Sequence, residues 1–140
     1  MLESALYTAT ATAHGGRDGR VNTDDGRLDL VVAPPKELGG PGGATNPEQL
    51  FAAGFAACFH SALMLVGRRA RQDVSGSEVT ARVDLGKSSG GPGYELRVDL
   101  AVALPALDRD AAQDLVAKAD AVCPYSNATR GNITVTHHVL

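Results

Sequence analysis

The stretch that decides the fold runs from Asn46 to Gly67 and reads NPEQLFAAGFAACFHSALMLVG. Its opening is typical of a helix start, because Asn46 can cap the helix and Pro47 suits the first helical position. Glu48 lies in the first turn, where the helix dipole favours a carboxylate, and Gln49 could complete a capping box. The remaining residues include no Asp, Glu, Lys or Arg. We therefore predict one long, buried helix.

This helix is apolar on nearly every side. Its apolar residues include Phe51, Phe55, Cys58, Phe59, Leu63, Met64 and Val66. A helix that is apolar all round is buried all round, and a chain of 140 residues can hardly surround it with its own sheet. We therefore expect a homodimer. The segment is also close to the shortest length that spans a membrane, but Ala, Gly, His60 and Ser61 dilute it, which favours a buried helix of a soluble domain.

Segments on both sides of the helix alternate between apolar and polar residues, as strands do. They are residues 6–13, 28–32, 79–85, 96–104 and 133–140. The glycine-rich stretch 36–45 is expected to be a loop. A second helix is predicted from Asp108 to Cys123, where Pro124 ends it. The order predicts one α+β domain over residues 1–140, with antiparallel sheets around the long buried helix.

Composition excludes several classes of protein. Sixteen acidic against thirteen basic residues give a net charge of −3, which argues against a nucleic-acid-binding protein. Two cysteines are too few for a disulfide-stapled domain or for a zinc site made of cysteine alone. The N-terminus lacks the basic and apolar regions of a signal peptide. We therefore expect a cytoplasmic protein with no membrane partner, whose thiols stay reduced unless they cycle.

The two cysteines fall in different helices. Cys58 and Cys123 can form one disulfide, form one redox pair, or remain inert core thiols. A reactive thiol must ionise, which burial opposes and a nearby cation favours. The long helix supplies no cation near Cys58. Arg17 is a candidate because its glycine-flanked turn allows a close approach, although a solvated turn arginine is the alternative.

The histidines offer weaker candidates. His60 follows Cys58 by two residues, about 200° around the helix, so their side chains diverge. This disfavours a cysteine hydrolase and favours a hydrogen-bonded core or interface histidine. His137 and His138 lie on opposite faces of a predicted strand, which disfavours a shared metal site.

Four segments together resemble the organic hydroperoxide resistance proteins, the Ohr branch of the Ohr/OsmC family. They are Leu6–Thr12, Gly15–Gly19, Thr45–Phe59 (TNPEQLFAAGFAACF) and Cys123–Asn132 (CPYSNATRGN). The resemblance covers essentially the whole chain. It implies an OsmC-like fold, an intertwined homodimer with active sites at the subunit interface, and a thiol peroxidase that reduces organic and lipid hydroperoxides to alcohols.

The resemblance also implies a role for four residues. Cys58 corresponds to the peroxidatic cysteine and Cys123 to the resolving cysteine. Arg17 corresponds to the arginine that activates the thiolate, and Glu48 to the acid that orients this arginine. No cofactor or metal is implied as a bound group, and the reductant is an external lipoyl dithiol, either dihydrolipoamide or a lipoylated protein. The chain departs from the family in a shorter glycine loop before Thr45, in Phe55 where tyrosine is common, and in the residues that follow Phe59.

The expected chemistry agrees with the residue types. Aromatic residues can wall an apolar pocket that suits alkyl or lipid hydroperoxides. We expect this pocket at Phe51, Phe55, Phe59 and Tyr125. Glu48 lies about 15 Å from Cys58 along one helix, so we predict that Arg17 and Glu48 of one chain serve Cys58 of the other. The alternative is a non-catalytic thiol redox sensor or an apolar-ligand-binding protein, which has less need of a buried, oriented arginine.

Overall fold

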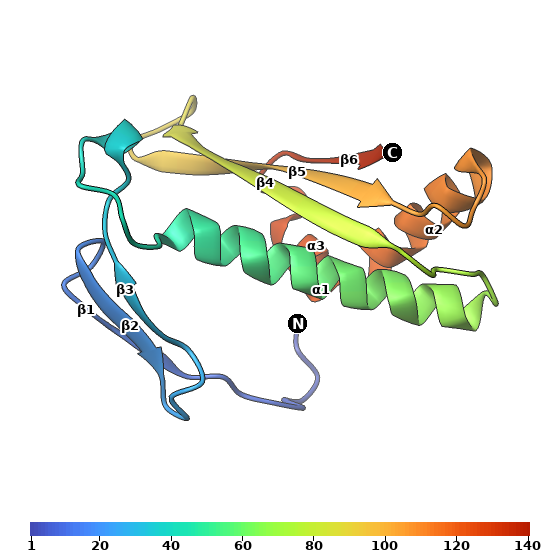
Figure 1. Ribbon diagram of the computed structural model, residues 1–140, viewed down its shortest axis with the longest axis horizontal. Coiled ribbons are helices and arrows are strands. Elements are labelled where there is room, and N and C mark those ends of the chain that lie inside the picture. Colours follow the sequence, from blue (N-terminus) through green and yellow to red (C-terminus); the bar gives the residue numbers. More distant parts are fainter. The chain divides into compact units, whose positions relative to one another are not determined.

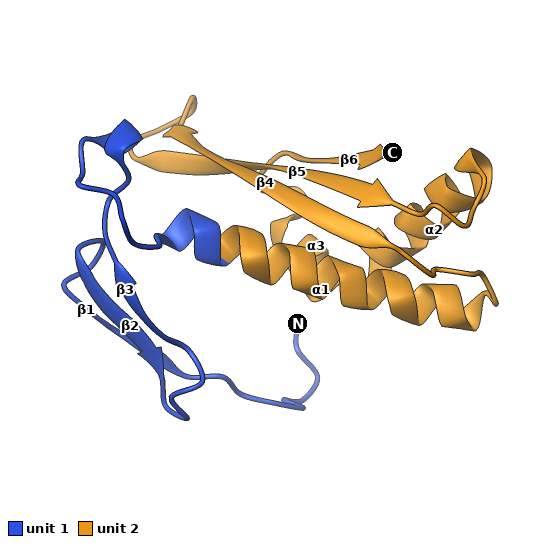
Figure 2. Cartoon of the chain, in the orientation of Figure 1, with its two compact units in different colours: residues 1–50 blue, residues 51–140 orange.

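The computed structural model describes residues 1–140, which form two compact units, residues 1–50 and residues 51–140 (Figures 1 and 2). The elements in chain order are β1 (Ala11–His14), β2 (Gly19–Thr23), β3 (Asp29–Val32), the short 3-10 helix η1 (Lys36–Leu38), α1 (Pro47–Arg69), β4 (Glu78–Lys87), β5 (Tyr94–Ala103), α2 (Arg109–Val122), α3 (Pro124–Thr129) and β6 (Val135–Val139). The predicted α+β class is confirmed. The expectation of a single domain stays a prediction beside this division into two units.

The first unit contains a three-stranded antiparallel meander, β1-β2-β3. β1 and β3 overlap the predicted strands 6–13 and 28–32, whereas β2 was not among the predicted strands. The first strand begins later than expected. Pairing starts at Ala11, opposite Thr23, because β2 ends there and the chain turns toward β3. Leu6 and Tyr7 therefore lie outside the strand, and both are exposed.

The long helix begins where the sequence predicted. The Asn46 side chain accepts a hydrogen bond from the backbone N–H of Gln49 at 2.9 Å, and Pro47 is the first helical residue. The second half of the expected capping box does not form. Instead, the Gln49 side chain accepts a hydrogen bond from the Thr45 hydroxyl at 2.8 Å. The preceding stretch, expected to be loop, contains the single turn η1 and ends in an isolated parallel bridge between Thr45 and Val32.

The second unit is built on the sheet β4-β5-β6. β4 and β5 form a long antiparallel hairpin, which pairs Glu78 with Ala103 and Lys87 with Tyr94. β6 pairs with β5 in parallel, so our expectation of purely antiparallel sheets was wrong for this strand. The reason is the connection: the chain passes through α2 and α3 before it returns as β6, and such a crossover permits parallel pairing.

The core of the second unit lies between α1, β5 and α2 (Figure 1). Its largest fully buried side chains are Phe55, Phe59, Leu63, Val98, Leu100, Val102, Leu115 and Cys123. The opposite face of α1 carries Ala53, Ala57, Ser61 and Met64 and is exposed in the single chain. One chain therefore buries one face of α1, and a second copy that covers the other face stays a prediction.

By length and composition alone, α1 is also apolar enough to cross a membrane. The core helix of a soluble protein passes the same test. The buried face of α1, which packs against β5 and α2, identifies it as a core helix of this unit.

Candidate functional site

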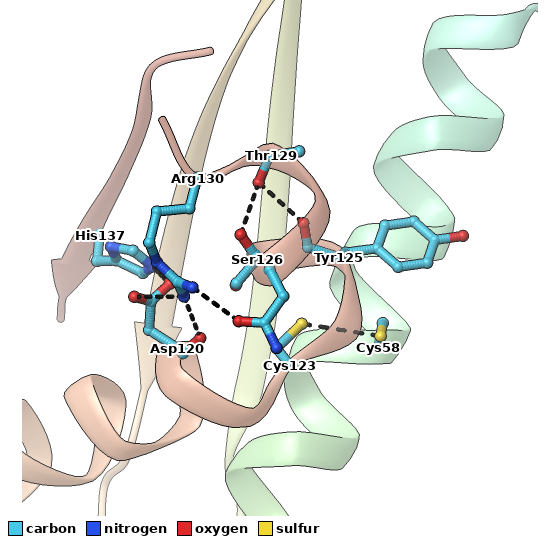
Figure 3. A network of polar contacts seen from close by, with 9 residues as sticks. Cys58, Asp120, Cys123, Tyr125, Ser126, Thr129, Arg130 and His137 are labelled. Carbon is cyan, nitrogen blue, oxygen red and sulfur yellow. Dashed lines mark hydrogen bonds and ion pairs between the residues drawn. The ribbon is translucent and has the colours of Figure 1, made fainter. Parts of the chain in front are cut away.

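The fold brings the two cysteines together across 65 residues of sequence. The Cys58 and Cys123 sulfurs are 3.7 Å apart and both are free thiols (Figure 3). A disulfide bond is about 2.05 Å long, so a small side-chain movement would join the two sulfurs. Cys123 is completely buried, whereas Cys58 is partly exposed. A reagent from solution therefore reaches Cys58 more readily than Cys123.

A sharp turn between two helices places Cys123. α2 ends and α3 begins at this one residue, whose backbone is extended. Its N–H donates to Ala119 at 2.9 Å, and its carbonyl accepts from the N–H of Asn127 at 2.9 Å. Pro124 ended the predicted helix as expected, but it also starts α3, which we did not predict. Proline suits both roles because it lacks an N–H and its φ is already helical.

Burial is the main influence on the ionisation of Cys58. It raises the pKa of the Cys58 thiol, and the neighbouring Cys123 thiol raises it further. The backbone N–H of Tyr125 opposes this rise through a hydrogen bond. The pKa of Cys58 stays above its ordinary value of 9.0, and no cation is among the groups that shift it. A reactive Cys58 thiolate therefore requires a positive charge from elsewhere.

The first unit holds such a charge in a fixed position. Arg17 donates two parallel hydrogen bonds to the Glu48 carboxylate, Nη2 to Oε1 at 2.6 Å and Nη1 to Oε2 at 2.8 Å. The hydrogen bond from Arg17 lowers the pKa of Glu48, so the carboxylate stays charged. The Arg17 side chain remains 45% exposed, and its other N–H groups are available to a ligand. Two predicted site residues are thus joined, 31 positions apart.

The turn that carries Arg17 depends on glycine. A Cβ atom at Gly19 would collide with the backbone carbonyl of His14, which cannot move without distorting the turn. Gly19→Ala is therefore expected to lower the free energy of unfolding by about 1–3 kcal/mol, measured by urea denaturation. Gly86→Ala is the control, because no atom lies near its added Cβ. Equal stability of the two variants would contradict a requirement for glycine at position 19.

The predicted aromatic pocket residues divide into two groups. Phe51, Phe55 and Tyr125 contact one another, with ring centroids 5.6 to 6.1 Å apart. Gly54 faces this cluster, because a Cβ there would lie 2.7 Å from the Tyr125 hydroxyl. Phe59 instead packs in the core against the His137 ring, 5.5 Å between centroids. Phe55 and Phe59 are both fully buried, so both have the surroundings of core residues, and the substrate role of all four stays a prediction.

His60, His137 and His138 each lie near one polar or acidic side chain. One ring nitrogen of His60 lies 2.9 Å from the Ser77 hydroxyl, in agreement with a hydrogen-bonded histidine directed away from Cys58. A surface hollow of about 660 Å³ lies beside His60 and does not include either cysteine. His137 lies 3.4 Å from Asp120, and His138 lies 3.7 Å from Asp99. Each histidine of the β6 pair thus faces its own acid.

One cluster beside Cys123 was not predicted from the sequence. Arg130, Asp120 and Asn127 are hydrogen-bonded around the α2–α3 turn. Arg130 stands in the segment CPYSNATRGN that carried the family resemblance, but the resemblance implied no role for it. The absence of a basic residue in the last turn of α2 was the available signal.

Comparison with known proteins gives the family. The family model described as OsmC-like protein matches residues 40–138. An organic hydroperoxide resistance protein of Xanthomonas axonopodis pv. citri is 51% identical over 136 residues, which cover 96% of this chain and 94% of that protein. The chain belongs to the Ohr/OsmC family. The resemblance stated from the sequence is thereby confirmed.

Two further members of the Ohr/OsmC family support the fold and the branch. The organic hydroperoxide resistance protein OhrA of Bacillus subtilis is 50% identical over 143 residues and covers 99% of both chains. The crystal structure of an organic hydroperoxide resistance protein from Legionella pneumophila has a TM-score of 0.92 and 50% identity. The match covers 97% of this chain and 98% of the Legionella chain. The Ohr/OsmC fold predicted from the sequence is therefore confirmed.

Proposed function

We propose that this member of the Ohr/OsmC family is a cysteine-based peroxidase that reduces organic and lipid hydroperoxides to alcohols. The observation that carries the proposal is the pair of free thiols 3.7 Å apart, one partly exposed and one buried. The relatives named organic hydroperoxide resistance proteins support the choice of substrate. As an antioxidant enzyme of this kind, it would act in the cytoplasm, with no nucleic-acid or membrane partner.

The reaction follows from the different exposure of the two thiols. The Cys58 thiolate attacks one oxygen of the hydroperoxide, the O–O bond breaks, and the alcohol leaves after it takes a proton. Cys58 becomes a sulfenic acid. The Cys123 thiol then attacks the Cys58 sulfur, which forms the disulfide and releases water. An external dithiol reduces the disulfide by exchange and is itself oxidised to a cyclic disulfide.

A lipoyl dithiol is the reductant we propose, either free dihydrolipoamide or a lipoylated protein. No bound cofactor takes part in the cycle, because both electrons of each step come from sulfur. Since Cys123 is completely buried, the external thiol attacks the Cys58 sulfur of the disulfide and Cys123 is the leaving thiol.

The Arg17–Glu48 pair supplies the charge that Cys58 lacks. Burial raises the pKa of the Cys58 thiol, so a guanidinium is needed to stabilise the thiolate. The bidentate contact with Glu48 fixes the plane of the Arg17 guanidinium, and its free N–H groups can donate to the peroxide oxygens. We propose that this pair acts on Cys58 of the other chain in a homodimer. Phe51, Phe55, Phe59 and Tyr125 would then provide the apolar wall for the substrate.

Steady hydroperoxide turnover distinguishes a peroxidase from the alternative, a non-catalytic thiol redox sensor or apolar-ligand-binding protein. Reduced protein is mixed with excess cumene hydroperoxide and dihydrolipoamide, and peroxide loss is followed. The peroxidase consumes many equivalents per chain. Oxidation of one equivalent that then stops would favour a thiol redox sensor, and apolar-ligand binding without thiol loss would favour a binding protein.

Cys123→Ser separates the two chemical steps. The first oxidation of Cys58 should proceed at close to the wild-type rate, since the only change near Cys58 is the replacement of the Cys123 sulfur by oxygen. Turnover with dihydrolipoamide should fall by roughly ten-fold or more, because no internal thiol resolves the sulfenic acid. A sulfenic-acid-specific dimedone label, detected by mass spectrometry, should accumulate on Cys58. Undiminished turnover without label would remove Cys123 from the cycle.

A further inference from the structure

The guanidinium of Arg130 joins the two helices on either side of Cys123 (Figure 3). Its Nη2 donates to the backbone carbonyl of Asp120 at 2.7 Å and to the Asp120 carboxylate at 3.3 Å. Its Nη1 donates to the Asn127 side-chain oxygen at 2.7 Å. Asp120 belongs to α2 and Asn127 to α3, so one planar group spans the turn at which Cys123 lies.

The Arg130 contact supplies a hydrogen-bond donor and a positive charge that the C-terminal end of α2 lacks. The last carbonyls of a helix have no partner within it, and a cation near them is favourable. The last turn of α2 contains no basic residue. Arg130 supplies both the missing donor and the missing charge to Asp120, from beyond the end of the next helix. His137 of β6 approaches the same carboxylate at 3.4 Å, which places the turn beside a third element.

The contacts of Arg130 determine the position of Cys123 more than they change the free energy of unfolding. The side chains of Arg130 and Asp120 are 51% and 33% exposed, and exposed ion pairs add little to the free energy of unfolding. However, α2 and α3 meet at the single extended residue Cys123, so the angle between them determines where its sulfur lies. The same turn carries the Tyr125 N–H that contacts Cys58.

We propose that Arg130 is a positioning residue that holds Cys123 within reach of Cys58. The proposal rests on the redox cycle proposed above. The sulfenic acid of Cys58 has two competing fates. Cys123 attacks its sulfur to give the disulfide and water, or a second hydroperoxide oxidises it to the sulfinic acid and is reduced to the alcohol. By keeping the two sulfurs close, Arg130 favours the disulfide and protects Cys58 from irreversible oxidation.

Three variants test this role. Arg130→Met keeps the apolar stem but removes every donor, and Arg130→Lys keeps the charge without the planar fork. Arg97→Met is the matched control, because Arg97 also donates to a carboxylate, Asp84, at 2.6 Å and is similarly exposed at 63%. Arg97 lies on the β4–β5 hairpin rather than at the α2–α3 turn.

The expected result is a selective loss in the second step. After one equivalent of cumene hydroperoxide, Arg130→Met should form the disulfide roughly ten-fold more slowly than wild type, because small misplacements of reacting groups are costly. The rate of the first step, in which the peroxide oxidises the Cys58 thiol, should change by less than about two-fold. At excess peroxide, mass spectrometry should find more sulfinic acid on Cys58. The rate of disulfide formation and the yield of sulfinic acid in Arg130→Lys should lie between those of wild type and Arg130→Met. Arg97→Met should match wild type in both.

A second measurement does not depend on peroxide. In a glutathione redox buffer, the equilibrium constant for the Cys58–Cys123 disulfide should be roughly ten-fold lower in Arg130→Met than in wild type. If wild type fails to consume hydroperoxide but this shift appears, the proposed function fails and the positioning role stands. If Arg130→Met and Arg130→Lys both keep the wild-type disulfide rate and equilibrium, or if Arg97→Met is equally affected, the positioning role is overturned. Should Arg130→Met not fold, the same two measurements on Arg130→Lys decide between these outcomes.

Discussion

A Cys58→Ser variant is expected to lose hydroperoxide consumption by a factor of at least about 10³, as enzymes do when their nucleophile is removed. Serine is not ionised at neutral pH and does not attack the O–O bond. Cys123 is unable to substitute, because it is completely buried behind Cys58. The measurement is the rate of cumene hydroperoxide loss with dihydrolipoamide in excess, compared with the rate without protein.

The matched control is Cys123→Ser, compared in the first oxidation without dihydrolipoamide. It removes the neighbouring sulfur, so its turnover falls as stated above, but it should still consume one equivalent of hydroperoxide per chain, which Cys58→Ser should not. Thermal denaturation of both variants should show midpoints close to that of wild type, if the serine is accommodated. Consumption of one equivalent by Cys58→Ser, together with none by Cys123→Ser, would reverse the roles of the two cysteines.

Arg17→Ala is expected to slow the first oxidation of Cys58 by about 10²–10³ at neutral pH, the usual effect of removing one preorganised electrostatic group. Burial raises the pKa of the Cys58 thiol above its ordinary value of 9.0, so without the guanidinium little thiolate is present. The thiol ionises as pH rises, and the variant's rate should therefore rise with pH into the alkaline range. Stopped-flow measurement of thiol loss from about pH 6 to 10 gives both the rate and its pH dependence.

Arg20→Ala is the control for general effects on this sheet. Arg20 lies on β2, donates to Asp29 at 2.7 Å and is 56% exposed, close to the 45% of Arg17. Its replacement should leave the rate within about two-fold, because exposed ion pairs contribute little. An unchanged rate in Arg17→Ala, or an equal loss in both variants, would remove Arg17 from the reaction.

Mixed dimers test which chain Arg17 serves. When Cys58→Ser and Arg17→Ala chains are combined in one dimer, a site shared between chains leaves one Cys58 facing one Arg17. Activity should then reappear on mixing the two impaired proteins. If Arg17 acts on Cys58 of its own chain, no intact site forms and the mixture stays as slow as the Arg17→Ala protein.

Local patterns in the sequence predicted α1, α2 and the long β4–β5 hairpin, but not the short helix α3. The Asn46–Pro47 start of α1 and the Asp108 start of α2 depend on a few neighbouring residues. Both helices begin as predicted, and the Asn46 and Asp108 side chains each accept a hydrogen bond from a backbone N–H of the first turn. The alternation of β4 and β5 reflects one buried and one exposed face of the same hairpin. Each of these features is determined within a few residues, which is why sequence alone sufficed.

Features that depend on distant partners were not predictable in the same way. β6 pairs in parallel because of the crossover through α2 and α3, and nothing within residues 135–139 encodes that direction. β1 begins at Ala11 because its partner strand ends opposite it, although the alternating pattern starts earlier. The capping box failed because the Thr45 hydroxyl competes for the Gln49 side chain.

In the candidate site, too, the residues could be named from the sequence, but their contacts with distant partners could not. Cys58, Cys123, Arg17 and Glu48 were named from the resemblance, and the structure places them in two hydrogen-bonded pairs. Their proximity is a result of tertiary folding, since 65 residues separate the cysteines. Arg130 was missed because its contacts with Asp120 and Asn127 appear only when α3 folds back against the end of α2.

The proposed cycle requires one hydroperoxide to convert the Cys58 and Cys123 thiols into a disulfide within one chain. Fully reduced protein is therefore treated with one equivalent of cumene hydroperoxide, alkylated, digested without reduction and examined by mass spectrometry. We predict a single cross-link between the peptides that contain Cys58 and Cys123, with one equivalent of the alcohol released. Two alkylated thiols and unchanged peroxide would contradict the cycle.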